Sequence, residues 1–150
     1  MPEYRGEVVL ATDVESVFEF LTNPANLTAL IPEDTTMRIL SAPPTLGAGS
    51  VIEFEVDHFG LPQRLAHELT EWEPPRRFVE RMIRGPLKSY VHEHVFEELG
   101  PQRARVVDVI RFEPPGGLLG RLISSDFLLR SLEEGFAFRY DALRRRFGAG

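Results

Sequence analysis

The sequence predicts an α+β protein in which a curved antiparallel sheet of about seven strands wraps around a long C-terminal helix, with two short helices after the first strand. Two observations predict this class. Between residues 36 and 113, apolar and polar residues alternate with a period of two, in segments bounded by Gly or Pro. From residue 118 onward the apolar residues instead recur at helical spacing. A sheet with one apolar face needs a cover, and the C-terminal helix can supply it.

The first elements are short. A strand is expected over Glu3–Ala11. Thr12 and Glu15 have the spacing of a capping box, in which a hydroxyl and a carboxylate satisfy free amides at a helix start, and they predict a helix there. A second short helix is predicted to begin at Asn23-Pro24, because the missing N–H of proline costs nothing at the first helical position, and to stop before Pro32. Its expected buried side consists of Leu27, Leu30 and Ile31.

The region from Thr36 to Glu113 is predicted to form an antiparallel meander. Its clearest strands by alternation are Val51–Val56, Leu65–Trp72, Phe78–Ile83, Tyr90–Glu98 and Arg105–Glu113. Strands that alternate in this way have one face in water and one on a core. The inner face of the meander is therefore expected to meet the C-terminal helix.

The C-terminal helix is predicted to run from about Leu118 to Phe147, a length of about 45 Å. Ser124-Ser125-Asp126 breaks or recaps it, and Ser125 marks either a capped break or a place where the helix stands away from the sheet. Phe127 and Phe138 fall on the opposite side and would be exposed, as a partner surface would require. The predicted buried stripe consists of Leu118, Leu122, Leu129, Leu132, Phe136, Tyr140, Leu143 and Phe147.

Composition narrows the class of protein. The chain has 150 residues and a formal charge of −6, which favours a single domain over residues 1–150 and argues against a nucleic-acid partner. It has no cysteine, no apolar run near Met1, and no segment approaching the roughly 20 apolar residues of a membrane span. These features predict a soluble cytoplasmic protein, and they leave the oligomeric state open.

The order of these elements resembles the helix-grip fold of the START-like superfamily, also called SRPBCC, and the resemblance covers nearly the whole chain. Within the superfamily the sequence is similar to a bacterial subgroup of uncharacterised ligand-binding proteins. Where that subgroup favours Asp, Gln and Trp, this chain has Glu80, Met82 and Tyr90. The motifs that carry the resemblance are Asn26-Leu27-Thr28 before Ile31-Pro32, Trp72-Glu-Pro-Pro, Phe78, Gly85-Pro86, His92-x-His94-x-Phe96, Asp108 and Phe138-Arg139.

The resemblance implies a fold and a cavity more strongly than a chemistry. The superfamily includes lipid-transfer domains, polyketide cyclases and birch-pollen-type allergens, so one scaffold carries many functions. It also includes a co-chaperone branch that acts through protein contacts. Ligand binding, cyclase or dehydratase activity, and protein interaction are therefore all open.

Two histidines lie two residues apart in the segment Lys88–Glu97. Tyr90, His92, His94 and Phe96 share one face of this strand, and the other face carries Glu93 and Glu97. Burying two carboxylates would be costly, so we expect the histidine face to point inward. The other histidines, His58 and His67, lie on separate strands and are expected to be ordinary.

Carboxylates on the neighbouring strands are expected to reach the two histidines. If the turn that contains Pro101 joins the strands tightly, Asp108 falls opposite His94 or one pair away. Glu80 and Met82 on the preceding strand point the same way. Such a cluster could be a satisfied polar network, could orient the polar end of a ligand, or could transfer protons as a His–carboxylate pair, with His92, His94, Asp108 and Glu80 as the catalytic candidates.

No metal or cofactor is predicted. The His-x-His spacing with Glu80 and Asp108 matches no established zinc pattern, and no Gly-rich phosphate loop is present. The sequence predicts binding of a small hydrophobic or amphipathic molecule between sheet and C-terminal helix. The expected binding residues are Phe54, Val56, Glu80, Met82, Tyr90, His92, His94, Phe96, Asp108, Ile110, Phe112, Ser125, Leu129, Leu132, Phe136 and Arg139.

Overall fold

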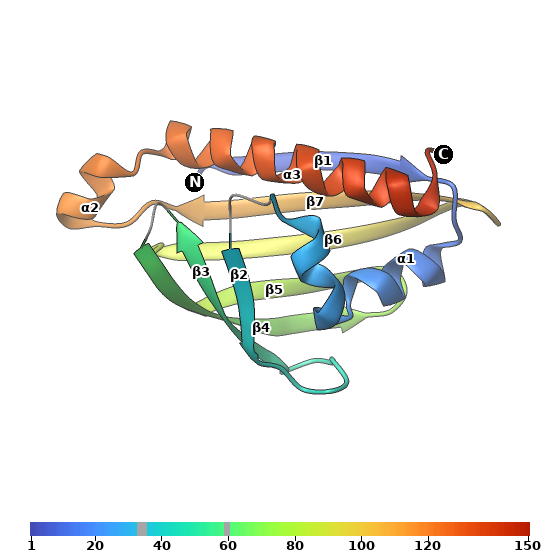
Figure 1. The fold of residues 1–150 in the computed structure, drawn as a ribbon, viewed down its shortest axis with the longest axis horizontal. Helices are drawn as coiled ribbons and strands as arrows, with labels where there is room; N and C mark the ends of the chain where they lie inside the picture. Colours follow the sequence, from blue (N-terminus) through green and yellow to red (C-terminus); the bar gives the residue numbers. More distant parts are fainter. Residues whose placement is uncertain (33–35, 59–60) are drawn as a thin grey trace.

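A computed structural model of the chain describes residues 1–32, 36–58 and 61–150. The described strands form one seven-stranded antiparallel sheet in the order β1-β7-β6-β5-β4-β3-β2, and the helices lie over one of its faces (Figure 1). Both the sheet and its helical cover are as the sequence predicts. The strands are β1 (Glu3–Leu10), β2 (Thr36–Ser41), β3 (Val51–His58), β4 (Leu61–Glu73), β5 (Arg77–Arg84), β6 (Ser89–Gly100) and β7 (Arg103–Glu113).

The first strand pairs with the last strand of the meander and forms one edge of the sheet. β1 pairs with β7, and Gly6 lies opposite Asp108 in that pairing. At the other end of the sheet β2 and β3 run steeply across the direction of β6 and β7, which shows how strongly the sheet curves (Figure 1). The curvature gives the sheet a concave face, and the helices cover that face.

Two short helices follow β1, as predicted, but the first is capped differently. Helix α1 (Val14–Leu21) begins after Asp13, whose carboxylate accepts hydrogen bonds from the backbone N–H (2.9 Å) and the hydroxyl (2.7 Å) of Ser16. The predicted capping box of Thr12 and Glu15 is therefore wrong. Thr12 is buried, and the neighbouring carboxylate satisfies the helix start instead.

The second short helix, η1 (Pro24–Leu30), is a 3-10 helix with Asn23 as its N-cap, where the sequence places a helix start. The Asn23 side chain accepts a hydrogen bond from the backbone N–H of Ala25 at 3.1 Å. Helix η1 packs against the C-terminal helix, so the two helices cover the sheet together.

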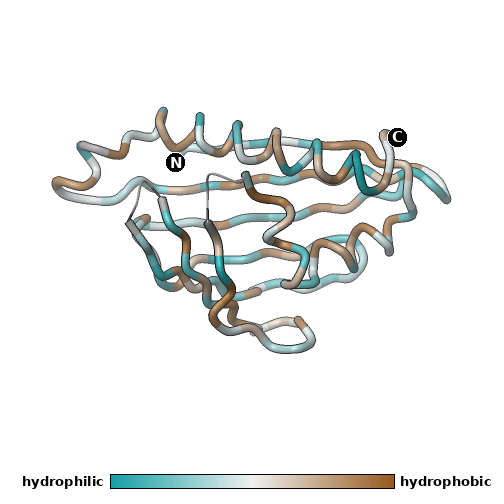
Figure 2. The backbone as a smooth tube through the Cα atoms, viewed as in Figure 1, coloured by the Kyte–Doolittle hydropathy of each residue, from teal (hydrophilic) through white to brown (hydrophobic). Residues whose placement is uncertain are grey.

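The C-terminal helical region is split. Helix α2 (Gly117–Leu122) is separated from α3 (Ser125–Phe147), and the hydroxyl of Ser124 caps α3 by accepting from the backbone N–H of Phe127 at 3.2 Å. The predicted break therefore exists, and the hydroxyl that caps it belongs to Ser124 and not to Ser125. Along α3, hydrophobic and hydrophilic residues alternate from turn to turn (Figure 2), and Phe136, Tyr140 and Leu143 are buried as predicted.

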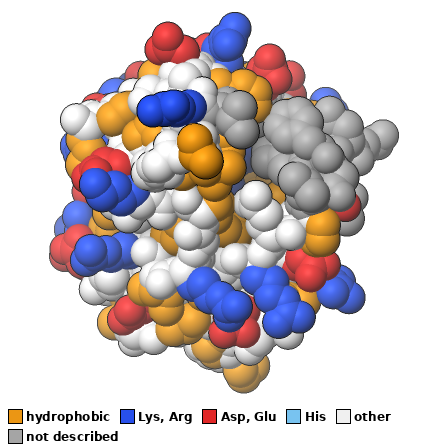
Figure 3. All heavy atoms as spheres, turned by 90° about the vertical axis from the view of Figure 1, so that its left-hand side faces the viewer, with side chains coloured by type: hydrophobic (Ala, Val, Ile, Leu, Met, Phe, Trp, Pro, Cys, Tyr) orange, Lys and Arg blue, Asp and Glu red, His pale blue; other side chains and the backbone are white. Residues whose placement is uncertain are grey.

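Helix α2 departs from the predicted buried stripe. Leu118 is 78% exposed, and the helix that carries it projects beyond the end of the sheet (Figure 1). On this end of the molecule hydrophobic side chains are interspersed with Lys and Arg (Figure 3). Among the residues that the structure describes, no helix is both long enough and apolar enough to span a membrane.

Candidate functional site

A cavity of about 740 Å³ lies between the concave face of the sheet and the helices η1, α2 and α3. Most of the binding residues predicted from the sequence line this cavity. The predicted residues that line it are Phe54, Val56, Glu80, Met82, Tyr90, His92, His94, Leu132, Phe136 and Arg139.

Six predicted residues do not line the cavity. Phe96, Ile110 and Phe112 point inward as expected but are buried in the core. Phe96, for instance, contacts Phe18 of α1, with ring centroids 5.0 Å apart. The other three residues are Asp108, which lies behind the histidines, and Ser125 and Leu129 on α3.

Much of the cavity wall consists of residues that the sequence does not predict. Leu27, Leu30 and Ile31 line the cavity, so the predicted buried side of η1 faces the cavity. Phe127, predicted to be an exposed partner surface, also lines it. Alternation along strands could not reveal these residues. The further lining residues are Leu21, Thr22, Pro24, Met37, Ile39, Leu46, Ile52, Gln63, Leu65, His67, Leu69, Phe78, Pro86, Leu87, Pro115, Leu119, Ile123, Leu128 and Ser131.

His92 and His94 point inward, toward the cavity. Each is only 3% exposed, and the two rings stack with centroids 3.5 Å apart. The predicted orientation of this strand is therefore confirmed. The alternation of β6 explains it, since Phe96 shares their face and Glu93 lies on the other.

Asp108 holds both histidines from behind. It lies opposite His94 in the β6–β7 pairing, as predicted, and is fully buried. Its Oδ1 lies 2.7 Å from His92 Nε2 and 3.3 Å from His94 Nδ1, and its Oδ2 accepts a 2.7 Å hydrogen bond from the Tyr140 hydroxyl. Burial would raise the pKa of Asp108, but the hydrogen bond from His92 and the nearby His94 ring outweigh it and hold the pKa well below its usual range.

The Tyr140 hydroxyl reaches Asp108 because the facing residue of β1 has no side chain. A Cβ at Gly6 would meet the hydroxyl oxygens of Tyr4 and Tyr140. Glycine is therefore required at position 6, because any side chain there would clash with these two hydroxyls.

Glu80 lies on the cavity side of the same histidines. It is opposite His92 in the β5–β6 pairing, with Oε1 3.5 Å from His92 Nδ1 and Oε2 3.8 Å from His94 Nε2. His67 also approaches it, with Nδ1 3.4 Å from Oε1. Burial would raise the pKa of Glu80, yet the three neighbouring imidazoles lower the pKa well below its usual value.

His67 is thus a member of the site, and the expectation that it is ordinary is wrong. It is buried on β4 and lies beside Met82 of β5 in the sheet. Sequence spacing could not show this, because β4 reaches the cluster through its pairing with β5. The side chain of His58 lies outside the described part of the chain. We call His67, Glu80, His92, His94 and Asp108 the histidine cluster.

His92 is placed between two carboxylates. Its Nε2 faces Asp108 and its Nδ1 faces Glu80. Because a carboxylate can only accept, the nitrogen 2.7 Å from Asp108 carries a proton. Burial disfavours the charged form of His92, but hydrogen bonds to Asp108 and Glu80 outweigh this effect and raise its pKa.

Two further polar side chains reach the cavity beside the cluster. The Tyr90 ring lies 5.2 Å from His67, and burial raises the pKa of its hydroxyl, so it remains a hydrogen-bond donor. The guanidinium of Arg139 lies 5.5 Å from the centre of the Phe136 ring. Its buried Nε has no hydrogen-bond partner among the described residues.

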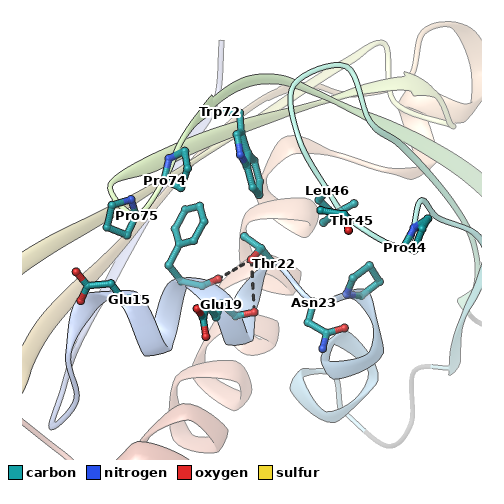
Figure 4. Close-up of a pocket in the computed structure, with 12 residues that line it drawn as sticks. Glu15, Glu19, Thr22, Asn23, Pro44, Thr45, Leu46, Trp72, Pro74 and Pro75 are labelled. Carbon is teal, nitrogen blue, oxygen red and sulfur yellow. Dashed lines mark hydrogen bonds between the residues drawn. The ribbon is translucent and has the colours of Figure 1, made fainter.

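A second pocket, of about 550 Å³, is lined by α1, the start of η1, residues 44–46 and the turn after β4 (Figure 4). Trp72, Pro74 and Pro75 form one wall, and Glu15 and Glu19 of α1 face them. One of its polar groups already has a hydrogen-bond partner within the protein, since the Thr22 hydroxyl donates to the carbonyl of Phe18 at 2.8 Å. It carries no cluster of ionisable groups comparable to that of the first cavity.

The arrangement can support three kinds of chemistry. The apolar wall can take a hydrophobic group, the histidine cluster with Tyr90 and Arg139 can hold a polar group, and the His92–Asp108 pair can move a proton. Ligand atoms of Glu80, His92 and His94 also lie within 4.8 Å of one another, which is the spacing of a possible metal site.

A curved sheet that grips a long C-terminal helix, with a ligand-sized cavity between them, defines a helix-grip protein of the START-like class. Residues 1–148 match the sequence profile of the family described as polyketide cyclase / dehydrase and lipid transport, and the chain belongs to that family. The resemblance stated from the sequence is thereby confirmed. No curated protein matches the chain.

Solved structures share this fold at low sequence identity. A protein from Chromobacterium violaceum has a TM-score of 0.77 and 17% identity, over 99% of this chain and 98% of that one. The Zhui aromatase/cyclase from Streptomyces sp. R1128 has a TM-score of 0.76 and 20% identity, with 99% and 98% covered. A START superfamily protein from Mycobacterium smegmatis has a TM-score of 0.71 and 12% identity, with 95% and 97% covered.

Proposed function

We propose that the protein binds a small hydrophobic or amphipathic molecule, such as a lipid-like or polyketide-like compound, in the cavity between sheet and C-terminal helix. The observation that carries this proposal is the cavity itself. Its volume of about 740 Å³ falls within the roughly 300–1,000 Å³ of small-molecule sites. Its wall is mostly apolar, with ionisable side chains gathered in one region, which suits a molecule with one polar end.

The distribution of side chains orients the ligand. Ile39, Phe54 and Leu132 lie on apolar parts of the wall and would contact its hydrocarbon portion. The polar end would lie against the histidine cluster, where the Tyr90 hydroxyl and the Arg139 guanidinium are available as donors. Filling the apolar part of the cavity should therefore exclude the ligand without disturbing the cluster.

Neighbouring residues of β2 provide a matched test. Ile39 lines the cavity, whereas Leu40 is exposed. Native mass spectrometry after incubation with a lipid extract should show a bound mass for the wild-type protein and for Leu40→Trp, but a reduced one for Ile39→Trp. Displacement of a fluorescent fatty-acid probe would give the affinities. Failure of the wild-type protein to take up any hydrophobic molecule would refute the proposal, and equal binding by both variants would place the ligand elsewhere.

A second candidate function is acid–base catalysis on a carbonyl compound, as in a cyclase or dehydratase. The 2.7 Å contact between His92 and Asp108 favours it, because a carboxylate behind an imidazole supports proton transfer near neutral pH. Incubation with polyketide-like substrates should then give cyclised or dehydrated products, and His92→Gln should abolish their formation while binding persists. Unchanged turnover in His92→Gln would exclude this role for the pair.

A further inference from the structure

The donor atoms of the histidine cluster are arranged in two layers. Asp108 faces one nitrogen of each ring of the stacked pair, His92 Nε2 at 2.7 Å and His94 Nδ1 at 3.3 Å. The opposite nitrogens, His92 Nδ1 and His94 Nε2, both face the Glu80 carboxylate, at 3.5 and 3.8 Å. The rings thus present one nitrogen each toward the cavity side, with a buried carboxylate behind them.

This is the arrangement expected of histidines that bind a metal ion. A ligating imidazole binds with one nitrogen while the other donates to a carboxylate or carbonyl, which fixes the tautomer and the ring orientation. Asp108 is placed to accept from both rings, and the Tyr140 hydroxyl holds Asp108 in turn. The carboxylate–histidine hydrogen bond is made by His92, and His94 Nδ1 lies 3.3 Å from the same carboxylate.

The distances between the donors are close to those of a metal site. The ligand atoms of Glu80, His92 and His94 lie within 4.8 Å of one another. At metal–ligand distances of about 2.0–2.2 Å, tetrahedral ligand atoms lie about 3.4 Å apart, so small side-chain rotations would close the set. His67 lies outside this set of three, but its Nδ1 is 3.4 Å from Glu80 Oε1.

An independent observation is that the ring nitrogens of His94 lack hydrogen bonds. Both are buried and neither has a hydrogen-bond partner among the described residues, although carboxylate oxygens lie 3.3 and 3.8 Å away. His67 Nε2 is likewise buried and has no hydrogen-bond partner among the described residues. Buried polar atoms are rarely left in this state, because an unsatisfied donor or acceptor costs free energy. A bound ion would use the nitrogen of His94 that faces Glu80.

We propose that Glu80, His92 and His94 bind a divalent transition-metal ion at the wall of the cavity, with His67 as a fourth donor. Imidazole and carboxylate together suit Zn²⁺, Fe²⁺, Co²⁺ or Ni²⁺, whereas Mg²⁺ and Ca²⁺ prefer sites made of oxygen. The sequence alone argues against a metal because His-x-His matches no zinc pattern. The remaining donors come from β5 and β4, and only strand pairing brings them to the histidines.

The site would open toward the cavity. Glu80, His67, His92 and His94 all line the cavity, so an ion among them could take a water molecule or the polar end of a bound molecule as a further ligand. A hydrophobic molecule can occupy the cavity without an ion, and an ion can bind without that molecule. The metal site and the proposed function can therefore fail separately.

The test uses the full chain without a histidine tag, stripped with a chelator and dialysed. Titration with Co²⁺, followed by visible absorption, should show saturable binding of one ion with the d–d bands of nitrogen and oxygen ligands. Zn²⁺ should compete for the same site, measured by isothermal titration calorimetry, and should raise the melting temperature. Mg²⁺ and Ca²⁺ at the same concentration should leave it unchanged.

Variants then assign the ligands. Glu80→Gln and His94→Gln should abolish saturable binding, and His67→Gln should weaken it. Asp108→Asn keeps the ligands but alters the group behind them, and it should reduce affinity about 10–100-fold. Glu93→Gln, on the outer face of β6, is the matched control and should bind as the wild type does. Near-ultraviolet circular dichroism would show that each variant is folded.

Two outcomes would overturn the proposal. One is a wild-type protein that shows no saturable binding of Co²⁺, Zn²⁺ or Ni²⁺. The other is equal affinity in the wild type and in folded Glu80→Gln and His94→Gln, which would mean that ions bind to the surface. If a ligand variant does not fold, the Co²⁺ spectrum of the wild type still decides, because fully hydrated Co²⁺ has only weak d–d bands and lacks the intense bands of a four- or five-coordinate site.

Discussion

The inner face of β6 meets two different environments only a few residues apart. Near its end, Phe96 joins an aromatic cluster of Phe18, Trp72 and Phe78, in which ring centroids lie 5.0–6.0 Å apart. Earlier in the same strand, His94 and His92 belong to the histidine cluster beside the cavity. Phe78 joins the two regions, since its ring stacks on His94 with centroids 3.9 Å apart.

The difference lies in what covers the strand. Helix α1 packs against β6 and β7 and inserts Phe18 into the aromatic cluster, so aromatic rings cover that part of the strand. Over the histidine cluster, α3 and η1 leave a cavity of about 740 Å³. A strand face that is uniformly buried can therefore serve stability in one part and binding in another. Substitutions in the two regions should separate these roles.

Phe18→Ala should have the largest effect on stability. Phe18 is buried and contacts three aromatic rings, and truncating a buried Phe costs about 3–5 kcal/mol through lost burial and the cavity left behind. Urea unfolding monitored by circular dichroism would measure the loss. Binding of ligand or ion by the folded fraction should be unchanged, because Phe18 does not line the cavity of the histidine cluster. A loss of binding without a loss of stability would contradict the separation.

Asp108→Asn should have the next largest effect, and it should affect both properties. The side-chain amide of Asn would place an N–H donor where Asp108 now accepts from His92 and Tyr140. One of these buried donors would then lack an acceptor, at a cost of about 3 kcal/mol. Urea unfolding would measure the cost, and the binding assays would measure the second effect. If stability falls and binding of both ligand and ion is retained, Asp108 is a structural residue alone.

The sequence predicts the fold well because the fold depends on periodicity. Alternation along β3 to β7 and the apolar spacing of α3 are local patterns, and each agrees with the structure. The inward orientation of His92 and His94 follows from the same rule, since turning the strand over would bury Glu93. The position of Asp108 opposite His94 follows from a tight turn.

The parts of the site that sequence could not predict depend on three-dimensional position. His67 joins the cluster because β4 pairs with β5, and no spacing between them in the chain shows this. Phe127 lines the cavity from the first turn of α3, and helical spacing alone does not show this, because it places Phe127 opposite Phe136. Leu118 is exposed on α2, which extends beyond the sheet.

Gly6→Ala should destabilise the protein by a smaller amount. The added methyl group would meet the hydroxyls of Tyr4 and Tyr140, and overpacking of this kind costs about 2 kcal/mol. Because the clash would displace the Tyr140 hydroxyl from Asp108, the histidine cluster should respond although no member of it is changed. Thermal unfolding would give the stability, and histidine ring signals in NMR would report the cluster. Unshifted ring signals would contradict this coupling.

Tyr140→Phe should have the smallest effect of the four, about 1.5 kcal/mol, because it removes a single hydrogen bond to a charged group and leaves the aromatic packing in place. Tyr4→Phe gives a comparison, since Tyr4 also contacts Phe136 and makes no hydrogen bond to Asp108 among those described, while its hydroxyl lies beside that of Tyr140. Urea unfolding of both variants would measure the difference. If the two substitutions cost the same, the contact between Tyr140 and Asp108 contributes nothing beyond packing. The support of the histidine cluster from α3 would then have to come from Phe136, whose ring lies 5.7 Å from that of His92.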